Sequence, residues 1–217
     1  SLVLESIGQE NLIKKMLKEK EVLLAEVFHR VKNNMNIVTS LLNLKKEISD
    51  SQEVKDALED CRNRVFSMAL VHQTIFNNNS IVELDFKAYI ESLTSEIKNS
   101  LGSNKSVDIH LDTEMLMLDL SNAIPCGLIL NELITNSFKY ANNESNTLVI
   151  QIKLRCNNNT VELEVRDNGQ GLSEDCQKNM HSLGMELINS LSEQVDGTHH
   201  FKNDNGLVFN LSFKLKS

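Results

Sequence analysis

With 217 residues, the chain is long enough for two modest domains, each with its own hydrophobic core. Hydrophobic residues make up 41% and charged residues 24%, values close to the average of folded globular proteins, which excludes disordered and fibrous classes. The formal net charge of −8 argues against nucleic acid as a partner, because its phosphate backbone attracts basic surfaces.

The lengths of the apolar runs and the spacing of the cysteines bear on the cellular location of the chain. The sequence has no run of roughly 18 apolar residues, the length that a membrane span needs, so we expect no membrane contact within this segment. The 4 cysteines lack C-x-x-C spacing and indicate neither a zinc site nor a disulfide framework, which favours a cytoplasmic location. The chain opens without Met, so we expect a fragment whose upstream sensor or membrane anchor is missing, with residues 1–20 as a candidate coiled-coil linker.

The first third of the chain carries an apolar helical repeat. From Leu24 to Leu42 the apolar residues follow at steps of four and three, which is typical of a helix that packs along a seam. Residues 49–52 predict a turn, and the repeat resumes from Val54 to Ile75 in a second, antiparallel helix. Residues 1–80 are therefore predicted to form a helical hairpin.

This predicted hairpin needs a partner. Its apolar stripe is wider than a two-stranded coiled coil requires, and two helices cannot enclose a core by themselves. We therefore predict a homodimer in which two hairpins form a four-helix bundle. The residues expected at its core are Leu24, Val31, Val38 and Leu42.

Residues 81–217 are predicted to form a second domain, an α/β sandwich. The turn-forming residues 77–80 mark the boundary, and helices are predicted over 86–101 and 121–141. Pro125 is expected in the first turn of the second of these helices, where its missing N–H costs least. Strands are predicted over 107–111, 148–156, 161–167, 197–202 and 208–215, with Asn157 to Asn159 as a hairpin turn.

The helix predicted over 121–141 carries a polar face near its end. Glu132, Asn136 and Lys139 share this face because they are four and three residues apart. A carboxylate, an amide oxygen and an ammonium group in a row can hold Mg²⁺ and triphosphate oxygens, since this cation prefers oxygen ligands and phosphate prefers cationic donors. The alternative is an ordinary amphipathic helix with a solvated polar face.

Two glycine motifs follow this helix. The sequence D-N-G-Q-G at 167–171 comes directly after a predicted strand, so Asp167 stands at the strand end beside glycines that let a flat ligand approach the backbone. By itself this motif is also ordinary turn chemistry. Further along, Gly184 stands just ahead of a predicted helix, whose free N–H groups could bind phosphate.

Together and in this order, the three elements resemble the N, G1 and G2 boxes of the nucleotide-binding fold shared by histidine kinases, gyrase-type topoisomerases, the heat-shock chaperone of the 90-kDa class and mismatch-repair ATPases. The resemblance implies that ATP and Mg²⁺ bind here. It makes Asn136 the Mg²⁺ ligand, Glu132 its polar neighbour and Asp167 the acceptor for the adenine amino group. The other residues that it places around the nucleotide are Asn131, Lys139, Tyr140, Gly169, Gly171 and Gly184.

The first predicted helix indicates which branch of this group is present. Residues 28–34, F-H-R-V-K-N-N, resemble the H-R-x-K-N-N phosphoacceptor box of a subclass of bacterial two-component sensor histidine kinases. Because Phe28 lies on the seam, His29 is expected to project toward solvent, where its imidazole can meet a phosphate. The resemblance implies an ATP-dependent protein histidine kinase that phosphorylates His29 and passes the phosphate to an aspartate of a response regulator.

Two more residues near His29 are candidates for a role. Widespread histidine kinases have an acidic residue directly after the phosphoacceptor, where this chain has Arg30, so Glu26 on the same helical face is the candidate general base. Asn33, one turn after His29, is a candidate for orienting the water that dephosphorylates the regulator.

Two alternative functions stay open. The first is a related ATPase, in which Glu132 activates water and free phosphate is the product. The second is a catalytically silent dimeric scaffold that docks a regulator. His29 and its helical hairpin count against the first, and the complete N and G1 motifs count against the second.

Overall fold

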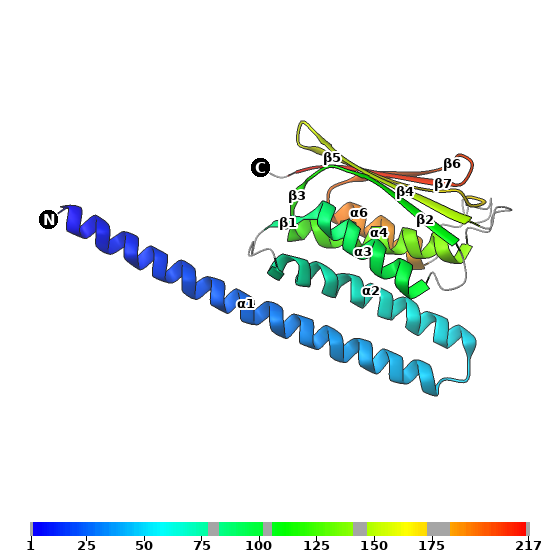
Figure 1. The fold of residues 1–217 in the computed structure, drawn as a ribbon, viewed down its shortest axis with the longest axis horizontal. Coiled ribbons are helices and arrows are strands. Elements are labelled where there is room, and N and C mark those ends of the chain that lie inside the picture. The colour runs from blue at the N-terminus through cyan, green and yellow to red at the C-terminus, as the bar shows by residue number, and fades with distance from the viewer. Residues whose placement is uncertain (1, 78–82, 102–105, 141–146, 173–182, 216–217) are drawn as a thin grey trace. The chain divides into compact units, whose positions relative to one another are not determined.

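The computed structural model describes residues 2–77, 83–101, 106–140, 147–172 and 183–215. The chain divides into two compact units, Ser1–Val82 and Glu83–Ser217. The first unit is made of helices, and the second packs helices against a sheet (Figure 1). The predicted α+β class, a helical hairpin followed by an α/β sandwich, is confirmed.

The first unit is a hairpin of two long helices, α1 (Leu2–Ile48) and α2 (Gln52–Asn77). Ser51 begins α2, because its hydroxyl accepts a hydrogen bond from the backbone N–H of Val54 at 3.4 Å. Lys46 of α1 forms an ion pair with Glu59 of α2 at 2.7 Å and ties the helices together near the turn. Burial alone would raise the pKa of Glu59, but Lys46 and Arg62 hold this pKa below its ordinary value.

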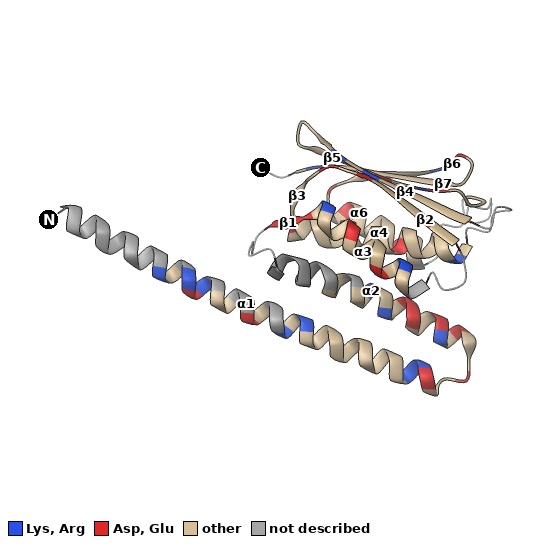
Figure 2. Ribbon diagram, viewed as in Figure 1, with Lys and Arg blue, Asp and Glu red and all other residues tan. Residues whose placement is uncertain are grey.

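Apolar residues of α1 divide between two faces. Val31, Met35 and Leu42 are half-buried, as expected for residues that pack on α2. A second set follows steps of four and three and is exposed: Ile37 by 58%, Leu41 and Leu44 by 57% each and Ile48 by 71%. No charged residue interrupts α1 from 33 to 44 (Figure 2). Of the other predicted core residues, Val38 is 42% exposed and the side chain of Leu24 lies outside the described residues.

The second unit is built on a five-stranded sheet of order β2-β4-β5-β7-β6, in which only the β2–β4 pair is parallel. Its strands are β2 (Ser106–Thr113), β4 (Thr147–Asn157), β5 (Thr160–Asp167), β6 (Thr198–Asn203) and β7 (Leu207–Lys214). The helices α3 (Phe86–Leu101), α4 (Leu120–Tyr140) and α6 (Leu183–Gln194) cover one face of the sheet (Figure 1). The core lies between these two layers.

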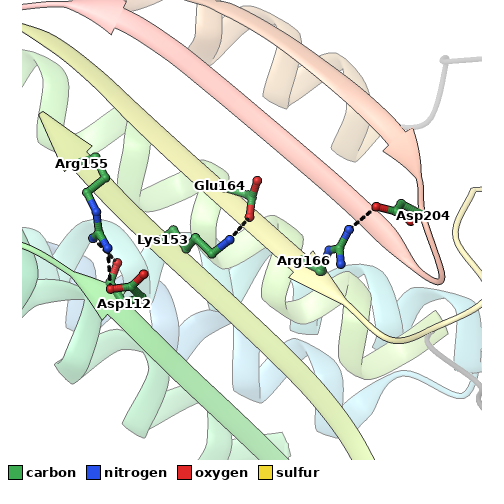
Figure 3. Close-up of polar contacts among 6 residues, drawn as sticks. All are labelled: Asp112, Lys153, Arg155, Glu164, Arg166 and Asp204. Carbon is green, nitrogen blue, oxygen red and sulfur yellow. Dashed lines mark hydrogen bonds and ion pairs between the residues drawn. The ribbon is translucent and has the colours of Figure 1, made fainter. Parts of the chain in front are cut away.

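The alternation of side chains along the central strands explains this layering. In β4 the residues Leu148, Ile150, Ile152 and Leu154 are buried, whereas their neighbours Lys153 and Arg155 lie on the opposite face. The open face carries ion pairs between neighbouring strands: Lys153 with Glu164 at 2.9 Å and Arg155 with Asp112 at 2.5 Å (Figure 3). Because these side chains are partly exposed, this face of the sheet is in contact with solvent. Ion pairs of this kind add little stability.

The hairpin turn between β4 and β5 is confirmed. Asn158 and Asn159 both adopt positive φ, 49° and 61°, while Asn157 pairs with Thr160 across the turn. Two consecutive residues with positive φ match the twist of a tight hairpin, and asparagine tolerates this conformation better than most residues.

Two local expectations need correction, and one pair of strands was missed. A two-stranded ribbon of β1 (Glu83–Asp85) and β3 (Met117–Asp119) was not predicted. Asp119 caps α4 by accepting a hydrogen bond from the N–H of Asn122 at 2.9 Å, so Pro125 lies in the second turn and removes one bond of the helix. Gly184 lies inside the first turn of α6 and not ahead of it, because that helix begins at Leu183.

His199 on the edge strand β6 makes folding sensitive to acid. Its ring lies against Phe201 and Phe209, with centroid distances of 5.8 and 5.9 Å. Burial and the neighbouring His200 lower the pKa of His199, while Glu193 raises it. Since the unfolded chain then binds the proton more readily than the folded one, protonation of His199 lowers the free energy of unfolding as the pH falls below about 6.5.

We predict that His199→Phe reduces the loss of thermal stability between pH 7.5 and 5.0. The measurement is the melting temperature of the second unit at both pH values in the parent and the variant. His110→Phe is the matched control, since His110 is an exposed histidine on the other edge strand of the sheet, β2, and is not among the groups that act on His199. If both proteins lose the same number of degrees on acidification, the role of His199 is wrong.

Candidate functional site

Helix α4 carries an unusual number of polar residues into the interior. Asn131 is 3% exposed, Glu132 9% and Ser137 4%. The helix gains its position from apolar residues on its other sides, among them Ile129, Leu133 and Ile134. Because buried polar groups are costly unless they are hydrogen-bonded, their presence on one helix indicates a site and not ordinary packing.

Asp167 is held by donors from three parts of the unit. Its Oδ2 accepts a hydrogen bond from the Ser137 hydroxyl of α4 at 2.8 Å. Its Oδ1 accepts bonds from the backbone N–H groups of Gly169 at 2.9 Å and Leu207 at 3.1 Å. Asp167 as a whole residue is 7% exposed. It is therefore oriented before any ligand arrives, and Oδ2 has the capacity to accept another bond.

Asn168 anchors the same loop to strand β4. Its Oδ1 accepts a hydrogen bond from the N–H of Val149 at 2.9 Å, and its Nδ2 donates to the carbonyl of Thr147 at 3.2 Å. The backbone N–H of Asn168 also donates to the Val149 carbonyl at 3.2 Å. The loop that carries Asp167 thus continues the β4–β5 ladder through a side chain.

Glu132 and Asn136 come together as expected for residues one turn apart. The Asn136 Nδ2 donates to Glu132 Oε1 at 3.4 Å. Across from them, a Cβ on Gly184 of α6 would collide with Glu132 Oε1, so a larger residue there would displace the Glu132 carboxylate. The N-box helix and the first turn of α6 therefore meet at Glu132.

The remaining residues of the predicted nucleotide site differ in exposure. Lys139 and Tyr140 are at the end of α4 and are exposed, Tyr140 by 71%. Gly169 uses its N–H for Asp167. Gly171 has φ +73°, and a Cβ there would come within 2.5 Å of Asn203 Oδ1. The glycines of the D-N-G-Q-G motif are thus engaged in contacts within the protein.

Sequence reasoning missed Ser137, Asn203 and Leu207. Each meets the Asp167 loop from 30 to 40 positions away in sequence. Ser137 also donates to the carbonyl of Leu133 at 3.0 Å, a contact that any helical serine can make. No signal in the sequence separates these residues from ordinary surface or helix residues.

The predicted phosphoacceptor lies in the middle of α1. The side chain of His29 lies outside the described residues, while the backbone at this position is helical. Glu26 accepts a hydrogen bond from Nε of Arg30 at 2.8 Å, with both side chains more than half exposed. Asn33 is exposed on the same helix. Because exposed pairs of this kind are weak, the Glu26 carboxylate stays available to another donor.

The described ranges bear on metal and membrane sites as well. Within them, no three His, Cys, Asp or Glu side chains are close enough together to hold a metal ion. None of the helices in the described part of the chain is sufficiently long and apolar to span a membrane.

Comparison with known proteins gives two family matches. Residues 26–101 match a model described as "Histidine kinase", and residues 121–217 match a model described as "Histidine kinase-, DNA gyrase B-, and HSP90-like ATPase". His29 lies in the first matched segment. The N-box helix and both glycine motifs lie in the second.

Two curated relatives carry related names. The chain is 25% identical over 189 residues to sensor histidine kinase PdtaS of Mycolicibacterium smegmatis, which covers 84% of this chain and 37% of that protein. It is 24% identical over 174 residues to blue-light-activated histidine kinase 2 of Erythrobacter litoralis, which covers 77% of this chain and 49% of that protein. The chain thus spans less than half the length of either relative.

A solved structure shares the fold. The histidine kinase domain of the Erythrobacter litoralis blue-light activated kinase superposes with a TM-score of 0.66 at 22% identity, covering 91% of this chain and 93% of that chain. At this level of identity the similarity speaks for the fold alone.

Proposed function

Since this chain belongs to the two-component histidine kinase family and forms its catalytic core, we propose that it binds ATP with Mg²⁺ and phosphorylates itself on His29. The observation that carries the proposal is the pre-oriented Asp167 carboxylate, which Ser137, Gly169 and Leu207 hold with one oxygen still able to accept. A carboxylate so placed suits the amino group of adenine.

The N-box contacts support the proposed Mg²⁺ ligand. Because Asn136 turns its amide nitrogen toward Glu132, its Oδ1 is the atom that faces away and can bind a hard cation. When bound, Mg²⁺ offsets the charge that develops on the phosphate oxygens during transfer. Lys139 supplies a cationic group at the end of the same helix, and Asn131 adds a buried amide one position before Glu132.

In the proposed reaction, a ring nitrogen of neutral His29 attacks the γ-phosphorus while the bond to the bridging oxygen of ADP breaks. The phosphorylated ring then releases the proton on its other nitrogen, and Glu26 is the carboxylate within helical reach to accept it.

The proposed next step is transfer to another protein. Phosphohistidine is a reactive phosphoryl donor, and an aspartate in the receiver domain of a response regulator is the expected acceptor. Asn33 lies one turn beyond His29 and is exposed, so it is our candidate for orienting the water that removes the phosphate from the regulator.

We also propose that a second copy of the chain covers the exposed stripe of α1. Ile37, Leu41, Leu44 and Ile48 repeat at steps of four and three on a face different from that of the half-buried residues. Two hairpins that bury this stripe form a four-helix bundle.

The dimer proposal predicts that Leu41→Asp shifts the protein to monomer. Burying an unpaired carboxylate in an apolar interface costs several kcal/mol, roughly a hundredfold or more in the dissociation constant. Asn43→Asp is the matched control, because it adds the same charge at an exposed position off the stripe. Sedimentation at micromolar concentration measures both. A Leu41→Asp protein that dimerises like the control contradicts the proposal.

Incubation with γ-labelled ATP tests the function against its alternatives. A histidine kinase acquires label that is stable in base and labile in acid. An ATPase of the chaperone or mismatch-repair kind releases labelled phosphate without labelling itself, and a silent scaffold does neither. The first outcome supports the proposal and the other two contradict it.

A further inference from the structure

The last residue of β6, Asn203, supports the loop that follows Asp167. The Asn203 side chain makes a pair of hydrogen bonds to one residue of this loop. Its Oδ1 accepts from the backbone N–H of Leu172 at 2.8 Å, and its Nδ2 donates to the Leu172 carbonyl at 2.8 Å. One side chain therefore satisfies both backbone groups of Leu172, as a neighbouring strand would.

Gly171 makes room for this pair of bonds. A Cβ at Gly171 would come within 2.5 Å of Asn203 Oδ1 and 2.7 Å of its Cγ, and its φ of +73° is a conformation that disfavours other residues. The second glycine of the D-N-G-Q-G motif is therefore needed for the contact with Asn203, whatever it contributes to a ligand.

The turn that follows Asn203 is itself in contact with Asp167. Leu207, the first residue of β7, donates its N–H to Asp167 Oδ1 at 3.1 Å. Gly206 has φ +134°, and a Cβ there would collide with the Asp167 carbonyl, so the two backbones touch. Asp204 forms an ion pair with Arg166, the residue before Asp167 (Figure 3). The β6–β7 hairpin thus holds the loop at both ends, at Asp167 through Leu207 and at Leu172 through Asn203.

We propose that Asn203 is a positioning residue of the nucleotide site: its two bonds to Leu172 hold the Asp167–Leu172 loop in the shape in which Asp167 recognises adenine. This inference rests on the proposed nucleotide function. When the loop is held at Leu172 as well, the N–H of Gly169 stays on Asp167 Oδ1 and the carboxylate stays aligned with the amino group. Without the bonds to Leu172 the loop can withdraw this donor, and the carboxylate loses one of the contacts that orient it. Only a side chain with both a donor and an acceptor satisfies Leu172.

The test compares adenine with guanine nucleotides, since guanine has a carbonyl where adenine has its amino group. Calorimetry on the full chain with Mg²⁺ and the β,γ-imido analogues of ATP and GTP gives both affinities. We expect Asn203→Ala to weaken the adenine analogue about three- to tenfold and to leave the guanine analogue almost unchanged. Asn203→Asp should show a similar loss, because a carboxylate accepts from the Leu172 N–H but cannot donate to its carbonyl.

Thr198→Ala is the matched control, an exposed substitution at the start of the same strand β6. The melting temperatures of all variants show whether a loss of affinity comes from a changed nucleotide site or from a less stable fold. Equal losses for both nucleotides together with a lower melting temperature mean a merely structural role and overturn the proposal. Unchanged affinities in the Asn203 variants overturn it while the nucleotide function stands. A parent chain that binds neither nucleotide overturns both.

Discussion

His29→Ala is expected to abolish self-phosphorylation and to leave nucleotide affinity within about twofold of the parent. The proposed phosphoacceptor is in the helical unit, whereas the nucleotide residues are in the unit Glu83–Ser217, so the substitution removes the nucleophile without touching the binding site. Label from γ-labelled ATP and calorimetry with the β,γ-imido analogue measure the two properties.

His72→Ala in α2 is the control for this experiment. His72 shares the helical hairpin with His29 and has the same intrinsic chemistry, but it lies outside the matched H-R-x-K-N-N pattern. The control should retain phosphorylation at the parent level. Acid-labile label on the His29→Ala protein, or its loss from the His72→Ala protein, would falsify the assignment of His29.

The elements that sequence periodicity predicted are those with long, regular burial patterns. The helix predicted over 86–101 has the bounds of α3, and the strands at 148–156 and 161–167 differ by one residue or so from β4 and β5. The ribbon of Glu83–Asp85 with Met117–Asp119 was missed, because three residues are too few to show alternation and the partners are far apart in sequence.

The residues of the candidate site also divide into those that the sequence predicts and those that it does not. Glu132 and Asn136 could be paired from helical spacing alone, and Asp167 from its place between a strand and glycines. The residues that orient Asp167 could not be predicted, since Ser137 and Leu207 reach it only when α4 and β7 pack beside β5. The motif thus locates the carboxylate that we propose for ligand recognition, while tertiary packing supplies the groups that orient it.

Asp167→Asn is expected to weaken ATP binding by about 1.5–3 kcal/mol, roughly ten- to hundredfold, because a neutral amide replaces a charged acceptor. Its oxygen can still accept from Gly169 and Leu207, but the other atom of the amide becomes a donor. A donor next to the adenine amino group is mismatched, while it suits the carbonyl of guanine. The ratio of ATP to GTP affinity should therefore fall more steeply than the affinity for ATP alone.

Two further variants show whether this loss comes from recognition. Glu162→Gln neutralises an exposed carboxylate on the same strand, so it should leave both affinities unchanged. Ser137→Ala removes the donor to Asp167 Oδ2 but keeps the carboxylate, and we expect a smaller loss for ATP, about three- to tenfold. The expected order of ATP affinity is therefore parent, Ser137→Ala, Asp167→Asn. Of these variants, only Asp167→Asn removes the charge of the Asp167 side chain. If this protein keeps the parent's ATP affinity and nucleotide preference, Asp167 does not recognise the base.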